Sequence, residues 1–258
     1  MSIFTKAIVR PPGENYADGI TAANLGAPDY HLALEQHRAY YDALAACGLT
    51  VISLPSDDAF PDSTFVEDTA VLTKNCVVVT QPGAESRRGE ITSMAKALAN
   101  EFDQLNFVEP PGTIDGGDVC QIEDHFVIGI SDRTNEDGAE QFAAYMKTAG
   151  FTAKNVDVRG MSGLLHLKSG LSYLGDGRIL ATEAIATHNA LNGLEVHVVP
   201  DDEQYAANCI RVNDFVLTPA GYPNAHQILT NLGYKLLILE MSEFQKMDGG
   251  LSCLSLRV

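Results

Sequence analysis

Pairs of short β-branched strands recur along the chain. Residues 69–80 read as two strands around a Lys-Asn turn. Three similar pairs follow, with turns at Glu-Asp, Gly-Asp-Gly and Asn-Asp, in residues 119–129, 171–180 and 209–217. The turns lie about 38 to 50 residues apart, a period typical of a propeller or a similar array. Residues 7–10 and 254–257 are strand-like and would supply a fifth pair, which would close the ring and leave no open sheet edge.

Helix-like stretches separate these strand pairs, in residues 87–103, 134–149 and 222–233. In the first of them, Ile91, Met94 and Leu98 recur at helical spacing, which predicts an amphipathic helix whose apolar stripe faces the core. Strand pairs alternating with helices indicate the α/β class. A chain of 258 residues is long enough to bury a sizeable core, and we expect residues 1–258 to form a single domain.

The charge of the chain restricts the class of partner. It contains 17 basic and 34 acidic residues, which gives a net charge of −17. A field of this sign argues against nucleic acid or an anionic membrane and suits a small cationic substrate, although an acidic surface also serves solubility alone. The first residues do not resemble a secretion signal, and no apolar run approaches the roughly 20 residues that span a bilayer. We therefore expect a cytoplasmic protein.

Cysteine usage points to reduced thiols. The five cysteines are scattered and include no CxxC pair, a pattern that fits neither a disulfide framework nor a zinc cage. Cys76, Cys120 and Cys209 lie in strand-like runs and are expected to be small buried residues. Cys253 differs because it follows Gly249 and Gly250, and a thiol on such a turn is more typical of a nucleophile than of packing.

Polar clusters precede four of the strand pairs, at residues 62–68, 115–118, 166–169 and 248–253. In a propeller the loops at one end converge on the axis, so catalytic groups are expected there. His166 stands before a strand pair, at the same point of its repeat as Asp68 and Asp118, and is either a catalytic base or a structural residue.

The sequence also makes predictions for two other histidines and for Asp115 with the glycine pair that follows it. His31 and His37 fall on a predicted helix and are expected at the surface. Asp115 either holds the imidazole of a catalytic histidine or forms a tight turn, because Gly116 and Gly117 admit backbone conformations closed to other residues.

Several segments together resemble the signature blocks of the dimethylarginine dimethylaminohydrolases, which are members of the pentein group of guanidino-group-modifying enzymes. The resemblance lies in residues 60–68, 82–90, 112–118, 166–170 and 248–253. It implies a five-bladed α/β propeller with pseudo-fivefold symmetry, built from ββαβ-type repeats. It also implies hydrolysis of Nω-methylated arginines to citrulline and the corresponding methylamine, with neither a metal nor an organic cofactor.

The resemblance further implies roles for individual residues. Cys253 would be the nucleophile, His166 the proton donor and then the base, and Asp115 the carboxylate that orients the imidazole. The residues implied in substrate binding are Asp68 and Glu67 at the guanidinium, Arg87 and Arg133 at the α-carboxylate, Asp62 and the carbonyl of Ile20 at the α-amino group, and the backbone of Met247 and Asp248 beside the reacting centre.

Alternatives remain open for these roles. Arg87 could be part of a solvated helix start, Arg133 could be an exposed loop residue, and Glu67 could point away from Asp68 because neighbours on a strand face opposite sides. Residues 14–26 are small and polar and form either a lid over the ligand or an ordinary surface excursion. Whether the thiol of Cys253 is ionised in the free enzyme is also open.

Two other functions compete with methylarginine hydrolysis. Arginine- or citrulline-specific hydrolases share the cysteine, the histidine and the acidic residues on the same scaffold. A propeller that only binds a partner is the second rival. The pattern does not choose between a monomer and a homodimer.

Overall fold

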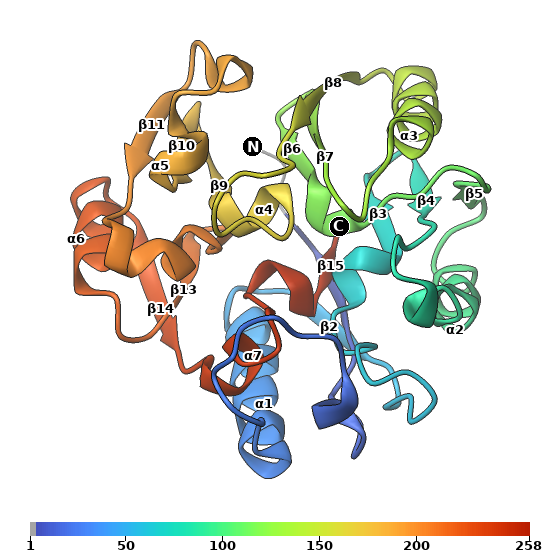
Figure 1. Cartoon of the computed structure of the whole chain (residues 1–258), viewed down its shortest axis with the longest axis horizontal. Coiled ribbons are helices and arrows are strands. Elements are labelled where there is room, and N and C mark those ends of the chain that lie inside the picture. Colours follow the sequence, from blue (N-terminus) through green and yellow to red (C-terminus); the bar gives the residue numbers. More distant parts are fainter. Residues whose placement is uncertain (1–3) are drawn as a thin grey trace.

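The computed structural model describes residues 4–258 and contains five three-stranded sheets arranged around a central axis (Figure 1). In each sheet the middle strand pairs antiparallel with one neighbour and parallel with the other. The antiparallel pairs are those that the sequence predicts. The parallel third strand follows a helical connection, as a ββαβ-type repeat requires.

The strands of each sheet are given in their order across the sheet. They are β15 (Leu256–Arg257), β1 (Lys6–Val9) and β2 (Thr50–Ser53); β3 (Ala70–Leu72), β4 (Val77–Val79) and β5 (Asn106–Phe107); β6 (Val119–Ile122), β7 (His125–Ile130) and β8 (Thr152–Asp157); β9 (Leu171–Gly175), β10 (Arg178–Ala181) and β11 (Glu195–Val198); and β12 (Ile210–Val212), β13 (Phe215–Pro219) and β14 (Lys235–Leu239).

The first and last strands close the ring. β1 and β15 pair antiparallel, with Ala7 opposite Arg257, which confirms the fifth strand pair. β15 is shorter than expected because residues 252–254 form a short helical turn instead of strand. The hydrogen bonds of this closure join segments from opposite ends of the chain.

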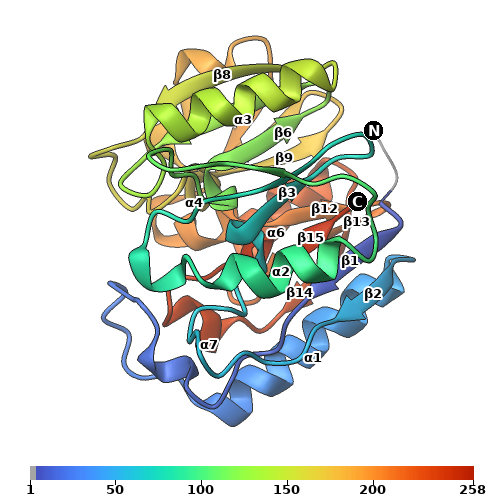
Figure 2. The same cartoon turned by 90° about the vertical axis from the view of Figure 1, so that its right-hand side faces the viewer.

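Helices connect the strands of the five sheets. They are α1 (Tyr30–Ala46), α2 (Glu90–Leu98), α3 (Glu136–Thr148), α4 (Leu167–Gly170), α5 (Glu183–Ala186), α6 (Pro223–Asn231) and α7 (Ser242–Gln245). Figure 2 shows α3, α2 and α1 along one side of the ring, while α4 lies toward the axis in Figure 1. The buried side chains of α3, Phe142 and Met146, pack with Phe126 and Ile128 of the sheet beneath it. No helix within residues 4–258 has both the length and the apolar character needed to cross a bilayer.

The expectation that His37 lies at the surface is wrong. Its side chain is buried in α1 against the core, and this burial lowers its pKa to about 4, despite a hydrogen bond with the backbone of Arg10. The helix is buried along part of its length because α7 and the strands β2 and β14 pack against it. His31 is exposed, as predicted.

A short helical turn precedes one strand of every antiparallel pair. The five turns are η2 (Val66–Thr69), η4 (Gly116–Asp118), α4, η6 (Asp201–Ala207) and η7 (Ser252–Leu254); the remaining 3-10 turns are η1 (Tyr16–Asp18), η3 (Glu85–Arg87) and η5 (Asn189–Leu191). η2 contacts η4 and η7, and α4 contacts η4 and η6. The polar clusters of the sequence therefore meet at one end of the axis.

Candidate active site

A cavity of about 240 Å³ opens at the end of the axis where the five turns meet. Cys253 and His166 both line it, together with Glu67, Lys168 and Asp248. Three of the five turns contribute these residues, namely η2, α4 with His166 at its start and η7, and Asp248 lies in the loop before η7. The ring thus brings the expected nucleophile and the expected proton donor to one cavity, although they are far apart in the sequence.

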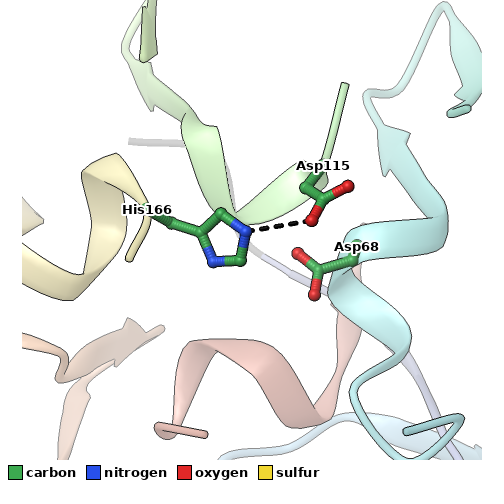
Figure 3. A group of neighbouring side chains, drawn as sticks. All are labelled: Asp68, Asp115 and His166. Atoms are coloured by element: carbon green, nitrogen blue, oxygen red, sulfur yellow. Dashed lines mark hydrogen bonds and ion pairs between the residues drawn. The ribbon is translucent and has the colours of Figure 1, made fainter. Parts of the chain in front are cut away.

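The imidazole of His166 is hydrogen-bonded to the carboxylate of Asp115 (Figure 3). The imidazole Nε2 lies 3.0 Å from Asp115 Oδ2, and both side chains are buried. The second carboxylate oxygen of Asp115 accepts a hydrogen bond from the Gly83 amide at 2.9 Å. Asp115 is thus fixed on both oxygens, and it engages Nε2 rather than Nδ1 of the His166 ring. The tight-turn alternative is insufficient to describe this residue.

The surroundings of His166 favour its charged form. Burial alone would lower the pKa of the imidazole, but the carboxylates of Asp68, Asp118 and Asp115 outweigh burial and raise the pKa to about 9. Asp118 is itself fixed by the hydroxyls of Ser131 and Thr134 and by the backbone amide that begins α4. At neutral pH the side chain of His166 is therefore an imidazolium.

Gly116 and Gly117 serve this site through their small size. Neither has a positive φ, so the expectation of an unusual backbone conformation is wrong. A Cβ at Gly117 would lie 2.8 Å from Nδ1 of His166, and one at Gly116 would collide with the carbonyl of Glu67. The glycines let the η4 turn approach both the imidazole and the η2 turn.

Cys253 lies in η7, after a turn in which Asp248 has a φ of 57°. Burial, followed by the negative charges of Glu67 and Asp68, raises the pKa of the thiol to about 12, although the Gly250 amide 3.4 Å from Sγ acts in the opposite direction. At neutral pH these surroundings favour a neutral thiol in the free protein.

The two acidic residues of η2 have separate partners. Asp68 forms an ion pair with Arg87 and accepts a hydrogen bond from the Gly117 amide. Burial would raise the pKa of Asp68, but His166 and Arg87 hold it below its ordinary value. Glu67 forms an ion pair with Lys168 and accepts a hydrogen bond from the Ser252 hydroxyl at 2.7 Å. Glu67 therefore faces the cysteine turn and Asp68 faces the histidine.

The two arginines differ in their environment. Arg87 is buried, and it donates to Asp68, to both oxygens of Glu90 and to the carbonyls of Asp62 and Phe65. The alternative of a solvated helix start is therefore wrong for Arg87. Within residues 4–258, the guanidinium of Arg133 has no ion pair or side-chain hydrogen bond, and Arg133 is half-buried. Its charge lies near enough to Asp62 to oppose the rise in pKa that burial causes there.

The segment expected to form a lid lies against the cysteine turn. The Ile20 amide donates to Asp62 at 3.0 Å, and the Ala22 amide donates to Asp248 Oδ2 at 2.6 Å. The Thr21 hydroxyl also reaches Asp248, at 3.2 Å. Met247 is buried, and its terminal methyl lies close to Gly19. Asp248 contacts the lid through its side chain, in addition to any backbone role.

Asp68, Asp115 and His166 also have the mutual spacing of metal ligands, since one ligand atom of each lies within 4.8 Å of the others. The carboxylate oxygens of the two aspartates already have other partners. Arg87 and the Gly117 amide hold Asp68, while Asp115 is bonded to Gly83 and to His166. The arrangement is that of a hydrogen-bonded group around an imidazolium.

Comparison with known proteins identifies the family of this site. The family model of eukaryotic N,N dimethylarginine dimethylhydrolase matches residues 29–188. The dimethylarginine dimethylaminohydrolase of Pseudomonas aeruginosa is 41% identical over 256 residues, which cover 99% of this chain and 100% of the relative. The chain belongs to the dimethylarginine dimethylaminohydrolase family. Membership makes it an amidinohydrolase, an enzyme that hydrolyses a carbon–nitrogen bond of an amidine group.

Solved structures of this family agree closely with the fold. A cysteine-to-serine variant of the dimethylarginine dimethylaminohydrolase from Pseudomonas aeruginosa, complexed with citrulline, matches with a TM-score of 0.97 and 41% identity over 100% of both chains. The N-terminal domain of the arginine dihydrolase ArgZ, bound to product, has a TM-score of 0.89 at 18% identity, covers 100% of this chain and 98% of that chain, and shows the fold alone. The fold is therefore the pentein α/β propeller that the resemblance implied.

Some residues of the site are not apparent from the sequence of this family member. Lys168 and Ser252 lie inside clusters that were noted, yet their contacts with Glu67 join segments distant in sequence. Asn208 was missed altogether, although it stands two residues before β12, as Asp68 stands two residues before β3. The offset is shared by these two repeats alone, because Gly117, Ser169 and Leu254 stand there in the others. His166 comes earlier in its repeat than expected, because α4 separates it from β9.

Proposed function

We propose that the protein hydrolyses Nω-methylated L-arginines to L-citrulline and the corresponding methylamine, with Cys253 as the nucleophile. The observation that carries this proposal is the pairing, in one cavity, of a neutral thiol with an imidazolium that a buried carboxylate orients. Relatives of the chain bear the name dimethylarginine dimethylaminohydrolase, and one was solved with citrulline.

The charges of the site favour a cationic substrate. Glu67 and Asp68 contribute to the raised pKa of the Cys253 thiol. A guanidinium beside Sγ would offset these negative charges and stabilise the thiolate, so that the substrate itself activates the nucleophile. A neutral ureido group would provide no such charge. Dimethylarginine and arginine therefore fit the site better than citrulline does.

The first half of the reaction replaces nitrogen with sulfur on the guanidinium carbon. The thiol proton leaves for solvent and Sγ bonds to the carbon, which gives a tetrahedral adduct. His166 then transfers its Nδ1 proton to the methylated nitrogen, the C–N bond breaks, and dimethylamine departs. The enzyme retains a cationic S-alkylthiouronium, and the imidazole is neutral.

The second half restores the enzyme. Neutral His166 takes one proton from a water molecule as the water oxygen bonds to the same carbon. The C–S bond then breaks with its electron pair on sulfur, and the adduct loses a second proton to become citrulline. The thiolate regains a proton, so the thiol and the imidazolium are both recovered.

Binding of the amino-acid end falls to residues outside the lining of the cavity that holds Cys253 and His166. Arg133 offers its whole planar fork to the α-carboxylate, since its guanidinium has no partner within residues 4–258. Arg87 donates through Nε, both hydrogens of Nη2 and one of Nη1, so it retains a single N–H for a ligand. Asp62 and the carbonyl of Ile20 would receive the α-amino group. The net charge of −17 is consistent with a cationic small molecule as partner.

The variant Cys253→Ser tests the nucleophile. We expect citrulline formation from dimethylarginine to fall by several orders of magnitude, with folding retained, because a hydroxyl is a far weaker nucleophile than a thiolate. Cys209→Ser is the matched control, since this buried thiol lies in the core between two other blades. Acid-quenched wild-type enzyme should carry the substrate-derived adduct on the peptide that contains Cys253. Full activity of Cys253→Ser would refute the proposed mechanism.

A further inference from the structure

Asn208 occupies the fifth of the turns that meet at the axis. It is the C-cap of η6, and only 7% of its surface is exposed. The other turns contribute Asp68, Asp118, the α4 helix with His166 at its start, and Cys253. Asn208 is the member of this ring whose side chain does not titrate, and the proposed chemistry gives it no role.

The side-chain amide of Asn208 joins the cysteine turn to the histidine helix. Its Oδ1 accepts a hydrogen bond from the Ser252 amide at 2.9 Å, and its Nδ2 donates to the Ser252 hydroxyl at 3.0 Å. Nδ2 also donates to the carbonyl of Lys168 at 2.8 Å. Ser252 immediately precedes Cys253, and Lys168 lies two residues after His166. One amide thus bridges the backbones that carry both reactive side chains.

Gly250 shows how closely the cysteine turn fits this amide. A Cβ at Gly250 would lie 2.5 Å from Asn208 Oδ1, and Gly250 does not have a positive φ. The glycine is therefore required for space rather than for backbone conformation. The cysteine turn therefore meets Asn208 at two points, by close packing at Gly250 and by hydrogen bonds at Ser252.

We propose that Asn208 is a positioning residue that holds the Cys253 thiol in register with the His166 imidazole. This inference rests on the proposed function, in which Sγ attacks the carbon whose nitrogen His166 protonates. Sγ and the imidazole must reach the carbon and the nitrogen of one guanidinium group at the same time. A misplacement of either group by about 1 Å can lower the rate about 100-fold. Asn208 acts through Ser252 and Lys168.

The variants Asn208→Ala and Asn208→Asp test this role. Alanine removes all three hydrogen bonds, whereas aspartate retains the shape and the acceptor for the Ser252 amide and loses both donors. We expect kcat for dimethylarginine to fall about 10- to 100-fold in each variant, with KM within about threefold of wild type. Substrate binding is spared because Arg133 and the lid belong to other turns.

Asn213→Ala is the matched control. The amide of Asn213 also makes three hydrogen bonds that join distant segments, to Phe4 and to the carbonyl of Cys47. It lies in the turn between β12 and β13, at the other end of that hairpin from Asn208. We expect this variant to lose thermal stability and to keep kcat within about twofold of wild type.

A second measurement does not depend on turnover. The rate of Cys253 alkylation against pH reports the charges around the thiol, which are those of Glu67, Asp68 and Lys168 and that of the His166 imidazolium, which lines the same cavity. The pH midpoint of Cys253 alkylation should differ between wild type and His166→Gln. When His166→Gln is combined with Asn208→Ala or Asn208→Asp, the shift that it causes in this midpoint should be smaller. The expected shrinkage stands even if another substrate is the right one.

The outcomes separate this inference from the proposed function. Wild type that forms no citrulline from methylated arginines contradicts the proposed function, while alkylation still tests Asn208. The positioning role would be overturned by folded Asn208 variants whose kcat stays within twofold of wild type and in which His166→Gln shifts the alkylation midpoint of Cys253 as much as it does in wild type. If Asn208→Ala does not fold, Asn208→Asp decides by the same criteria.

Discussion

The variant Asp115→Asn probes the group that charges and orients His166. Asparagine has the shape of aspartate and keeps an acceptor for the Gly83 amide, but it removes the negative charge 3.0 Å from Nε2. The rise in the pKa of His166 from 6.5 to about 9 corresponds to about 3 kcal/mol in favour of the imidazolium. Three carboxylates share this effect against the opposing cost of burial.

Loss of one of the three charges should lower the pKa of His166 by about one unit or more. With a lower pKa, His166 loses its proton at a lower pH. Because the first half of the reaction requires the imidazolium, the basic limb of the kcat profile should move to lower pH as well. We also expect kcat at its optimum to fall by about 10²- to 10⁴-fold, as the imidazole loses its orienting partner.

The assay is kcat against pH, with the titration of His166 followed by NMR of labelled histidine. Asp176→Asn is the control, because Asp176 is an exposed carboxylate in the turn between β9 and β10 and is paired with Arg211. Its removal changes the net charge equally and should leave the profile in place. An Asp115→Asn enzyme with wild-type kcat and an unmoved basic limb would refute the reasoning about His166.

Two further predictions concern the lid and acid stability. Asp248→Gly removes the carboxylate that accepts from Ala22 and Thr21 while tolerating the positive φ, so KM should rise roughly 5- to 10-fold and proteolysis of residues 20–26 should accelerate; an unchanged KM and cleavage rate would count against the latch. His37 has a folded-state pKa of about 4, below its usual 6.5, so the folded state binds fewer protons and loses about 3 kcal/mol of stability as pH falls from 6.5 to 4. His37→Gln should show a smaller loss than wild type in urea unfolding over that range, and identical slopes would contradict the assignment.

Local sequence patterns predicted most of the ring. Paired β-branched runs around polar turns fix the hairpins, and the pairing of β1 with β15 followed from the need to close the sheet edges. The third strands were not located individually, because β5 has two residues and β11 has exposed ends and a half-buried centre instead of a period-two alternation. Their place depends on parallel pairing with a distant hairpin, which leaves little local signal.

The sequence predicted which residue types gather at the candidate site better than it predicted their environment. The sequence singled out Cys253, His166 and Asp115, and the structure brings them together. The charge states of the thiol and the imidazole depend on burial and on carboxylates from other repeats, so no local pattern reveals them. The same holds for Arg87, whose partners lie in η2 and α2, and for Asn208, whose partners lie in α4 and η7.

The central claim is that a methylated guanidinium is the substrate of Cys253. Steady-state kcat/KM should be measured side by side for dimethylarginine, monomethylarginine, arginine and citrulline, with citrulline or ammonia release as the readout. We predict that dimethylarginine and monomethylarginine are turned over at least about tenfold more efficiently than arginine, and that citrulline is not consumed. Preference for arginine or for citrulline would contradict the proposed function.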